Sequence, residues 1–224
     1  MATTFAQGTL MQRRTTTGSS PVPDTYTTIA SVHSLTGPGM TGEPLDVSNQ
    51  DTPSGFRAYI SGMRTGGAMT FDISYAPADN THDASATGLI GDLKDGSEER
   101  WRLIFNTPVT TATITAVTTA TPVVVTSSSH PFTNGQSVLI TGASGMTDLN
   151  NKTFVVSDKA TNSFELSGFG SSQTFSGTCT ATLQTFFQFQ GFVSGFEVTA
   201  PVDGALMASV TLTSTGDVTQ PVFA

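Results

Sequence analysis

The clearest alternation of hydrophobic and polar positions lies in the second half of the stretch 56–79. The residues on its apolar face are Met69, Phe71, Ile73 and Tyr75. A period of two predicts a half-buried strand. Gly66-Gly67 precedes this strand, and glycine enters positive-φ turns at little steric cost. We therefore expect a hairpin that reverses at Gly66-Gly67, whose second strand packs on the core and ends at Ala76-Pro77.

Beyond this strand the hydrophobic period becomes that of a helix. The spacing i, i+3, i+4 and i+7 is that of Ala86, Leu89, Ile90 and Leu93, which predicts one apolar stripe. Asp79 can cap this helix by accepting hydrogen bonds from exposed backbone amides, and Gly96 ends it. We expect Leu89 and Leu93 in the core, and His82 and Asp83 as solvated residues at the helix start.

Other segments also have strand patterns. The stretch 26–35 predicts a strand with an irregularity, whereas 36–55 has little apolar content and predicts a long loop. In 185–198 the apolar parity changes at Gly191, which predicts a bulge or bend there, and Asp203-Gly204 predicts the next turn. Strands are also predicted over 101–105 and around 206–212. The core residues expected from these strands and from 185–198 are Trp101, Leu103, Phe187, Phe189, Leu206, Val210 and Leu212.

The pattern of hydrophobic residues changes between residues 109 and 184. Six short apolar runs, separated by turn residues at regular intervals, predict a small all-β barrel or sandwich, in which Cys179 is a buried small hydrophobe. The ends of this segment fall where two strands could otherwise form a hairpin, so it can be an inserted domain. The fold class expected is mainly β: a β-sandwich or barrel host domain (1–108 and 185–224) with one flanking helix, interrupted by a small all-β domain (109–184).

The composition of the chain restricts the classes of function that we expect. Only 12% of residues are charged and the net charge is −8, with nearly all of the acidity outside 109–184. Binding to nucleic-acid phosphates relies on Lys and Arg, so direct DNA binding is not expected. Arg13-Arg14 is followed by no apolar run, which argues against an export signal. No stretch has the length of a membrane-spanning helix, so no membrane insertion is expected.

The sequence offers little for catalysis or for metal binding. The histidines at 33, 82 and 130 are scattered, and the glycine-rich GASG segment lacks the lysine of a phosphate loop. The acidic residues Glu43, Asp46 and Asp51 do not have the fixed spacing of a calcium loop and are interrupted by prolines. We expect no enzyme activity, no cofactor and no metal.

Two parts of the chain resemble known families. Residues 8–105 and 185–217 resemble the tail tube proteins of long, flexible-tailed bacteriophages. The resemblance lies in the order of LDVSNQD, the GMRTGG turn, FDISYAPAD and the closing GFVSGFEVTAPVDGALMASVTLTSTGDV. The segment TPVVVTSSSHPFTNGQSVLITGASGMTDLNNKTFVVSDKATNSFEL resembles a small β domain found in many phage structural proteins.

The resemblance implies hexameric rings that stack into a hollow tube. The tube surrounds a tape-measure protein, carries viral DNA without binding it specifically, and meets tail terminator and distal tail proteins. Assembly takes place in the bacterial cytoplasm and the product is part of the virion. Contacts between subunits are expected from the N-terminal segment 1–25 and from the 36–55 loop. The candidate contact residues are Arg13, Arg14, Glu43, Asp46, Asp51, Arg57 and Tyr59. The alternative is a phage adhesion protein that binds host cells through the 109–184 domain, which is expected to face outward.

Overall fold

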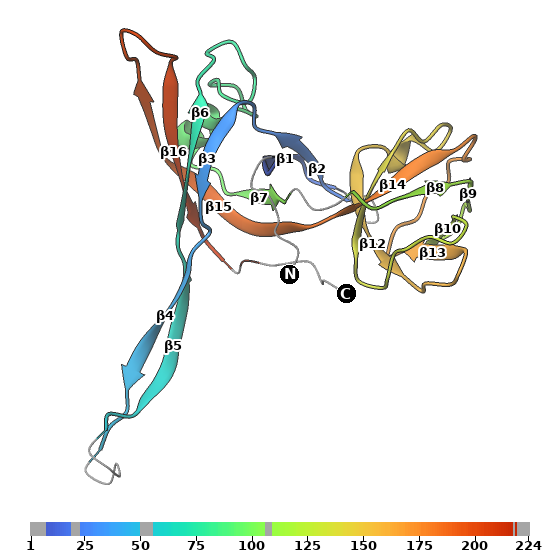
Figure 1. Ribbon diagram of the computed structural model, residues 1–224, viewed down its shortest axis with the longest axis horizontal. Helices are drawn as coiled ribbons and strands as arrows, with labels where there is room; N and C mark the ends of the chain where they lie inside the picture. The colour runs from blue at the N-terminus through green and yellow to red at the C-terminus, as the bar shows by residue number, and fades with distance from the viewer. Residues whose placement is uncertain (1–7, 19–22, 50–55, 106–108, 217, 219–224) are drawn as a thin grey trace. The chain divides into compact units, whose positions relative to one another are not determined.

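The computed structural model describes residues 8–18, 23–49, 56–105, 109–216 and 218. The chain is mainly β, as predicted, and its described part has one α-helix. It divides into two compact units (Figure 1): unit 1 is Met1–Ile29, Arg100–Gln188 and Thr219–Ala224, and unit 2 is Ala30–Glu99 and Phe189–Val218. These limits differ from the division that we predicted at 108/109 and 184/185, which stays a prediction.

One seven-stranded sheet has the strand order β2-β1-β7-β15-β16-β6-β3. Its strands in chain order are β1 (Leu10–Thr16), β2 (Thr25–Thr28), β3 (Val32–Thr36), β6 (Ala68–Ser74), β7 (Glu99–Ile104), β15 (Phe186–Thr199) and β16 (Met207–Ser214). The pairings of β1 with β2 and β7, and of β16 with β15 and β6, are antiparallel. The predicted strand over 26–35 is two strands, β2 and β3, separated at Ser31, which has a φ of 55°.

The predicted hairpin at Gly66-Gly67 is wrong. β5 (Tyr59–Gly66) pairs with β4 (Met40–Asp46), whereas β6 pairs with β3, so the chain runs on from β5 into β6 without reversing. Neither glycine has a positive φ. A Cβ at Gly66 would lie 2.5 Å from Ser214 Oγ, and one at Gly67 would lie 2.9 Å from Gly39 O. The glycines allow close approach of neighbouring chain, and the reversal lies between Asp46 and Tyr59.

The same pairing overturns the long loop predicted over 36–55. β4 occupies Met40–Asp46 and is exposed at every position, so it contributes no buried face that periodicity could detect. Its sequence MTGEPLD also contains Gly and Pro, which are depleted in strands. β4 is a strand because β5 supplies its hydrogen bonds, which is a tertiary effect.

The helix is shorter than predicted. α1 spans Leu89–Asp95, with Gly88 as its N-cap and Gly96 as a left-handed C-cap that donates to Asp92 O, as expected for Gly96. Asp79 lies ten residues before the helix and instead accepts from the amide and hydroxyl of Thr81, at 2.8 and 2.6 Å. Leu89 is buried as predicted, but Leu93 is 36% exposed, because the buried residues of this short helix are Leu89, Gly91 and Asp92 and Leu93 lies in its last turn.

Most of the predicted core residues of the seven-stranded sheet are buried. These are Met69, Phe71, Ile73, Trp101, Leu103, Phe189, Val210 and Leu212. Tyr75, Phe187 and Leu206 are only half-buried, and Phe186 is buried in place of Phe187. The predicted bulge at Gly191 lies three residues further on, between Val193 and Gly195, and Gly191 instead makes room for Thr213 O, 2.5 Å from where its Cβ would lie.

Seven short strands form a second sheet, within unit 1. They are β8 (Thr111–Ile114), β9 (Ala116–Val117), β10 (Val123–Thr126), β11 (Ser137–Thr141), β12 (Lys152–Ser157), β13 (Ser163–Leu166) and β14 (Cys179–Gln184), in the order β8-β14-β11-β12-β13-β10-β9. The two outer strands in this order, β8 and β9, are consecutive in the chain and are separated by Thr115 alone. The N–H of Thr115 donates to Thr126 O at 2.9 Å. The sheet therefore closes on itself as a small barrel, which removes open strand edges.

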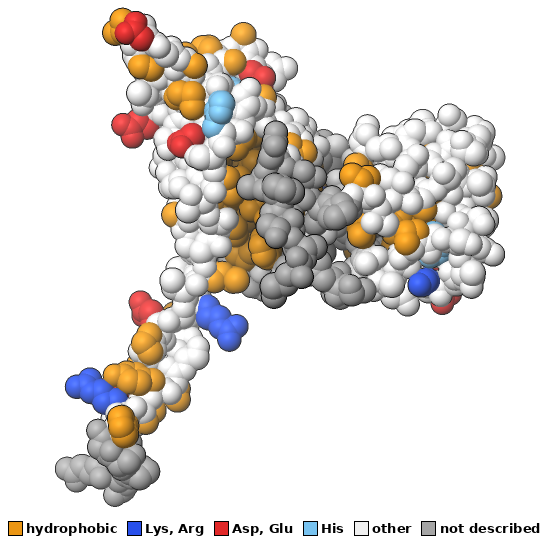
Figure 2. Space-filling model, viewed as in Figure 1, with side chains coloured by type: hydrophobic (Ala, Val, Ile, Leu, Met, Phe, Trp, Pro, Cys, Tyr) orange, Lys and Arg blue, Asp and Glu red, His pale blue; other side chains and the backbone are white. Residues whose placement is uncertain are grey.

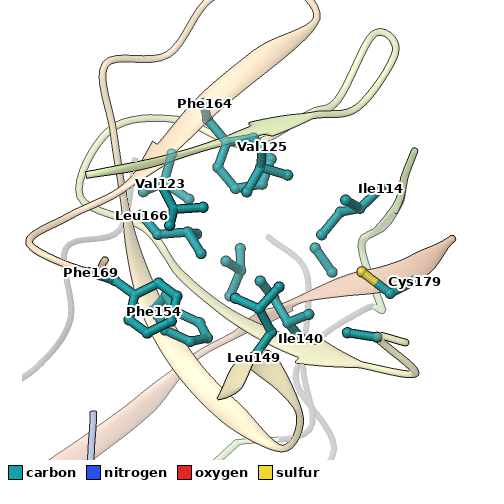
Figure 3. Close-up of a cluster of buried hydrophobic side chains, with 14 of the residues drawn as sticks. Ile114, Val123, Val125, Ile140, Leu149, Phe154, Phe164, Leu166, Phe169 and Cys179 are labelled. Atoms are coloured by element: carbon teal, nitrogen blue, oxygen red, sulfur yellow. The ribbon is translucent and has the colours of Figure 1, made fainter. Parts of the chain in front are cut away.

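Hydrophobic side chains fill this barrel. Figure 3 shows side chains from β8, β10, β11, β12, β13 and β14 pointing toward one another, together with Leu149 from a short 3-10 turn, η2 (Thr147–Leu149). Phe154 and Phe169 lie with ring centroids 4.8 Å apart. Cys179 is 5% exposed in this core, so its prediction as a buried small hydrophobe is confirmed.

Candidate interaction surface

The β4–β5 ribbon of unit 2 is the part of the described structure where apolar side chains lie most openly in solvent (Figure 2). We call this ribbon, the described residues 40–49 and 56–66, the arm. Its exposed apolar side chains include Leu45 (57% exposed), Ile60 (52%) and Met63 (86%), with Val47 just beyond β4. An isolated two-stranded ribbon is marginally stable in water, and exposed apolar patches commonly mark interaction sites.

A β-bulge decides which face of the arm these residues share. Gly42 pairs with Arg64 and Pro44 pairs with Ser61, so β5 has one residue more than β4 in this interval. The bulge brings the two backbones close: a Cβ at Gly62 would lie 2.7 Å from Glu43 O. Glycine is therefore required at position 62 for this register.

The bulge gathers the apolar residues on one face. Thr41 pairs with Thr65, and Leu45 pairs with Ile60. Residues 41 and 45 lie on the same face of β4, and paired residues of an antiparallel ribbon point to the same side. Thr65 and Ile60 therefore share a face, although they are five residues apart in β5. Met63 alternates with Thr65 and joins the same face. This face, which we call the apolar face, therefore carries Leu45, Val47, Ile60 and Met63 together with the acidic residue Glu43. An unbulged β5 would place Ile60 and Met63 on opposite faces.

The other face of the arm is more polar, although Met40 also lies on it. It carries Asp46 and Tyr59, which pair with each other, together with Ser61 and Arg64. Arg57 alternates with Tyr59 and lies 3.3 Å from the Asp46 carboxylate. The hydroxyl and amide of Ser48 donate to Asp46 and lower the pKa of this carboxyl group. Arg64 has no ion-pair partner among the described residues, so this face offers a cation to a partner.

Four of the predicted contact residues lie in or beside the arm: Glu43, Asp46, Arg57 and Tyr59. Asp51 lies outside the described residues. The sequence missed the apolar residues Leu45, Ile60 and Met63, because 36–55 was expected to be a loop and because the parity of β5 changes at Gly62. That change of parity beside a glycine was the available signal.

The prediction for Arg13 is wrong. Arg13 is 3% exposed in β1, and its guanidinium donates to the carbonyl of Arg14 at 2.9 Å. A side chain with so little accessible surface has almost none to offer a neighbour. Arg14 is half-buried and lies 3.9 Å from Asp24, which Arg100 also contacts at 2.8 Å. Both arginines of this doublet therefore serve unit 1 itself.

Arg102 of unit 1 also has a structural role. The Arg102 guanidinium lies 3.7 Å from the ring centroid of Tyr26 and 4.4 Å from that of Phe186, and its Nε donates to Gln188 at 2.8 Å. Burial lowers the pKa of Arg102 and raises the pKa of Tyr26. Cation–π contacts of this kind stabilise a desolvated guanidinium.

The expectation that His82 is solvated is wrong. His82 is fully buried in unit 2: its Nδ1 accepts from the amide of Ala76 at 3.3 Å and its Nε2 donates to Ala30 O at 2.9 Å. This pair of bonds requires the neutral tautomer protonated at Nε2. His82 thus fastens the segment after β6 to the segment between β2 and β3.

The two units differ strongly in charge. Unit 2 contains thirteen Asp and Glu residues against three Lys and Arg, a net charge of −10, whereas unit 1 has a net charge of +2. Two of the three cations of unit 2, Arg57 and Arg64, belong to the arm. The described arm also carries Glu43 and Asp46, so it has no net charge within an otherwise acidic unit.

Comparisons with known proteins give no assignment: no family model matches the chain, and no curated protein matches it. In the described part of the chain, no helix is both long and apolar enough to cross a membrane. The described residues also contain no group of three or more His, Cys, Asp or Glu placed to hold a metal ion. The physical features of the arm remain the strongest indication of function.

Proposed function

We propose that this protein is a self-assembling structural protein whose copies form stacked rings, the tail tube of a long-tailed phage. The observation that carries the proposal is the arm, one face of which exposes the four large apolar side chains Leu45, Val47, Ile60 and Met63. A feature of this kind is unfavourable in an isolated chain and is stabilised when another chain covers it.

Two further features support assembly. The outer strands of the seven-stranded sheet are β2 and β3 among the described strands, and open edges can pair with other chains. The barrel has closed its own edges, which suits a domain that is carried on the outside of an assembly. The same proposal places the protein in the virion, with the tape-measure, terminator and distal tail proteins as partners.

The acidity of unit 2 suits a conduit for DNA. A wall with a net negative charge repels phosphates, so the nucleic acid would pass without binding. No observation favours adhesion through the barrel over this function, since four of its five phenylalanines, Phe132, Phe154, Phe164 and Phe169, are buried and Phe175 is half-buried.

Negative-stain electron microscopy of the purified chain at high concentration tests the proposal. We expect rings with the symmetry that the resemblance implies, six-fold, and stacks of such rings. A protein that stays uniformly monomeric, with no rings or tubes under any nucleating condition, would overturn the proposed function.

A further inference from the structure

Unit 1 contains a small cavity, of about 230 Å³, between strands of the seven-stranded sheet and strands of the barrel. Its lining includes Gln12 of β1, Tyr26 of β2 and Arg102 of β7. From the barrel, Leu139 of β11 and Gln184 of β14 contribute to the lining. At about 30 Å³ for one water molecule, the cavity has room for roughly seven waters or for one small organic molecule. Its largely polar lining favours a polar ligand.

The cation in this lining, Arg102, has no carboxylate within ion-pair distance in the described part of the chain. Its guanidinium lies over the ring of Tyr26, which fixes the plane of the group. Asp24 also lines the cavity, but its carboxylate already meets Arg100 at 2.8 Å and Arg14 at 3.9 Å. The charge of Arg102 is therefore left for an anion, and a planar guanidinium can bind a carboxylate through two parallel hydrogen bonds.

Two side-chain amides of the lining each have one end occupied by a hydrogen bond. The hydroxyl of Thr153 donates to Gln184 Oε1 at 2.9 Å, which leaves the NH₂ group of Gln184 as a donor. Gln12 Nε2 donates to Thr28 Oγ1 at 3.1 Å, which leaves Gln12 Oε1 as an acceptor. Asn151, an exposed residue of the lining, lies at the opening of the cavity. The cavity thus offers a cation and an amide donor together with an amide acceptor.

We propose that this cavity binds a small hydroxylated carboxylate, such as a sugar acid. Arg102 and the Gln184 amide would hold the carboxylate group, and Gln12 Oε1 would accept from a hydroxyl group of the ligand. Leu139 offers an apolar surface to the carbon skeleton. A singly charged carboxylate suits the site better than a doubly charged phosphate, because the Asp24 carboxylate lies in the same lining. This binding site goes beyond the proposed function and does not depend on ring formation.

Isothermal titration calorimetry on the full chain tests the proposal, with D-glucuronate as the probe. The comparison compounds are D-glucose, which lacks the carboxylate, and acetate and inorganic phosphate, which lack the hydroxylated carbon skeleton. We expect glucuronate to bind with a Kd below about 1 mM and each comparison compound to bind at least about tenfold more weakly. The absence of saturable glucuronate binding would overturn the proposal, as would equally strong binding of acetate, phosphate or glucose.

Gln184→Glu locates the ligand, because it keeps the acceptor for Thr153 and replaces the amide donor by a negative charge. We expect its affinity for glucuronate to fall at least about tenfold. Gln136→Glu is the matched control and should bind like the wild type, since Gln136 Oε1 also accepts one bond, from Thr133 N at 2.9 Å, but lies outside the lining. Asn151→Asp, at an exposed position, provides a second test if Q184E does not fold. Unchanged glucuronate affinity in the cavity variants would overturn the proposed site.

Discussion

The backbone carbonyl of Glu43 lies 2.7 Å from the position that a Cβ at Gly62 would occupy. This close approach fixes the β-bulge that turns Ile60 and Met63 to the same face of the arm. One glycine thus links the register of an exposed ribbon to its interaction chemistry, and this relationship can be tested without disturbing the core.

Gly62→Ala is expected to impair assembly and leave the body of the protein intact. The added Cβ collides with the Glu43 carbonyl, so the bulge must shift, while β4 and β5 contribute little to the core. A loss of about 1.4 kcal/mol at one contact weakens association about tenfold. Thermal unfolding and sedimentation velocity measure the two effects.

Gly42→Ala is the matched control for this experiment. It lies in the same ribbon, and a Cβ there would be no closer than 3.8 Å to any atom outside its own chain neighbours. Equal assembly of G62A and the wild type would contradict the role of the bulge, as would an equal loss in G42A.

Arg57→Glu is expected to leave the monomer folded and to reduce assembly. The Arg57–Asp46 pair is exposed, and exposed pairs contribute little to stability. The reversed charge would repel Asp46 and the acidic surface of unit 2. Circular dichroism and sedimentation at low and high salt provide the measurements, with Lys159→Glu in the barrel as the control for charge alone. Undiminished assembly of R57E at low salt would refute the prediction.

His82→Ala is expected to destabilise unit 2 by about 2–4 kcal/mol, because the fully buried imidazole is removed and two part-buried backbone groups lose their hydrogen-bond partner. These groups are the amide of Ala76 and the carbonyl of Ala30. His33→Ala, at an exposed position of β3, is the control and should change stability far less. Chemical denaturation compares the two variants, and similar stability losses would contradict the structural role of His82.

The Cys179 thiol is expected to react slowly with alkylating reagents. It is also expected to make the free energy of unfolding depend on pH in the alkaline range. Burial raises the pKa of Cys179 from 9.0 to about 11. Folding therefore favours the protonated thiol. The stabilisation is complete below pH 9 and is lost as the pH rises through about 11, by at most about 3 kcal/mol.

Urea denaturation between pH 8 and pH 11, on the wild type and on Cys179→Ala, isolates this contribution. The variant lacks the thiol but keeps the other titrating groups. Iodoacetamide at pH 8 should label the native protein at least about a hundredfold more slowly than the unfolded chain, since the thiolate is the reactive form. Rapid labelling, or identical pH profiles, would contradict the burial of Cys179.

The sequence predicted best where one face of an element is buried. Met69, Phe71 and Ile73 alternate in β6, and the short runs of the barrel contain its core residues. It failed at β4, whose residues are all exposed and whose hydrogen bonds come from a strand more than ten residues away. Periodicity carries no information about a strand that has no buried face.

The candidate site was only half predictable for a related reason. The charged residues Asp46 and Arg57 were expected to make contacts, but the apolar face depends on pairing register, which one extra residue in β5 reverses. Gly66-Gly67 was misinterpreted as a turn, because a glycine can be required by the close approach of a neighbouring segment as well as by a positive φ. His82 and Arg13 were expected at the surface because they are buried by segments far away in sequence: His82 bonds to Ala30, and Arg13 pairs with Trp101 of β7.

The apolar face of the arm is expected to drive self-assembly. Sedimentation velocity on the wild type, on Ile60→Glu/Met63→Glu, and on the control Val155→Glu tests it most directly. We predict that the wild type and the control sediment as multiples of the 23.3 kDa chain, and that the arm variant sediments as a folded monomer. Assembly of the arm variant to the same extent as the wild type would contradict the account.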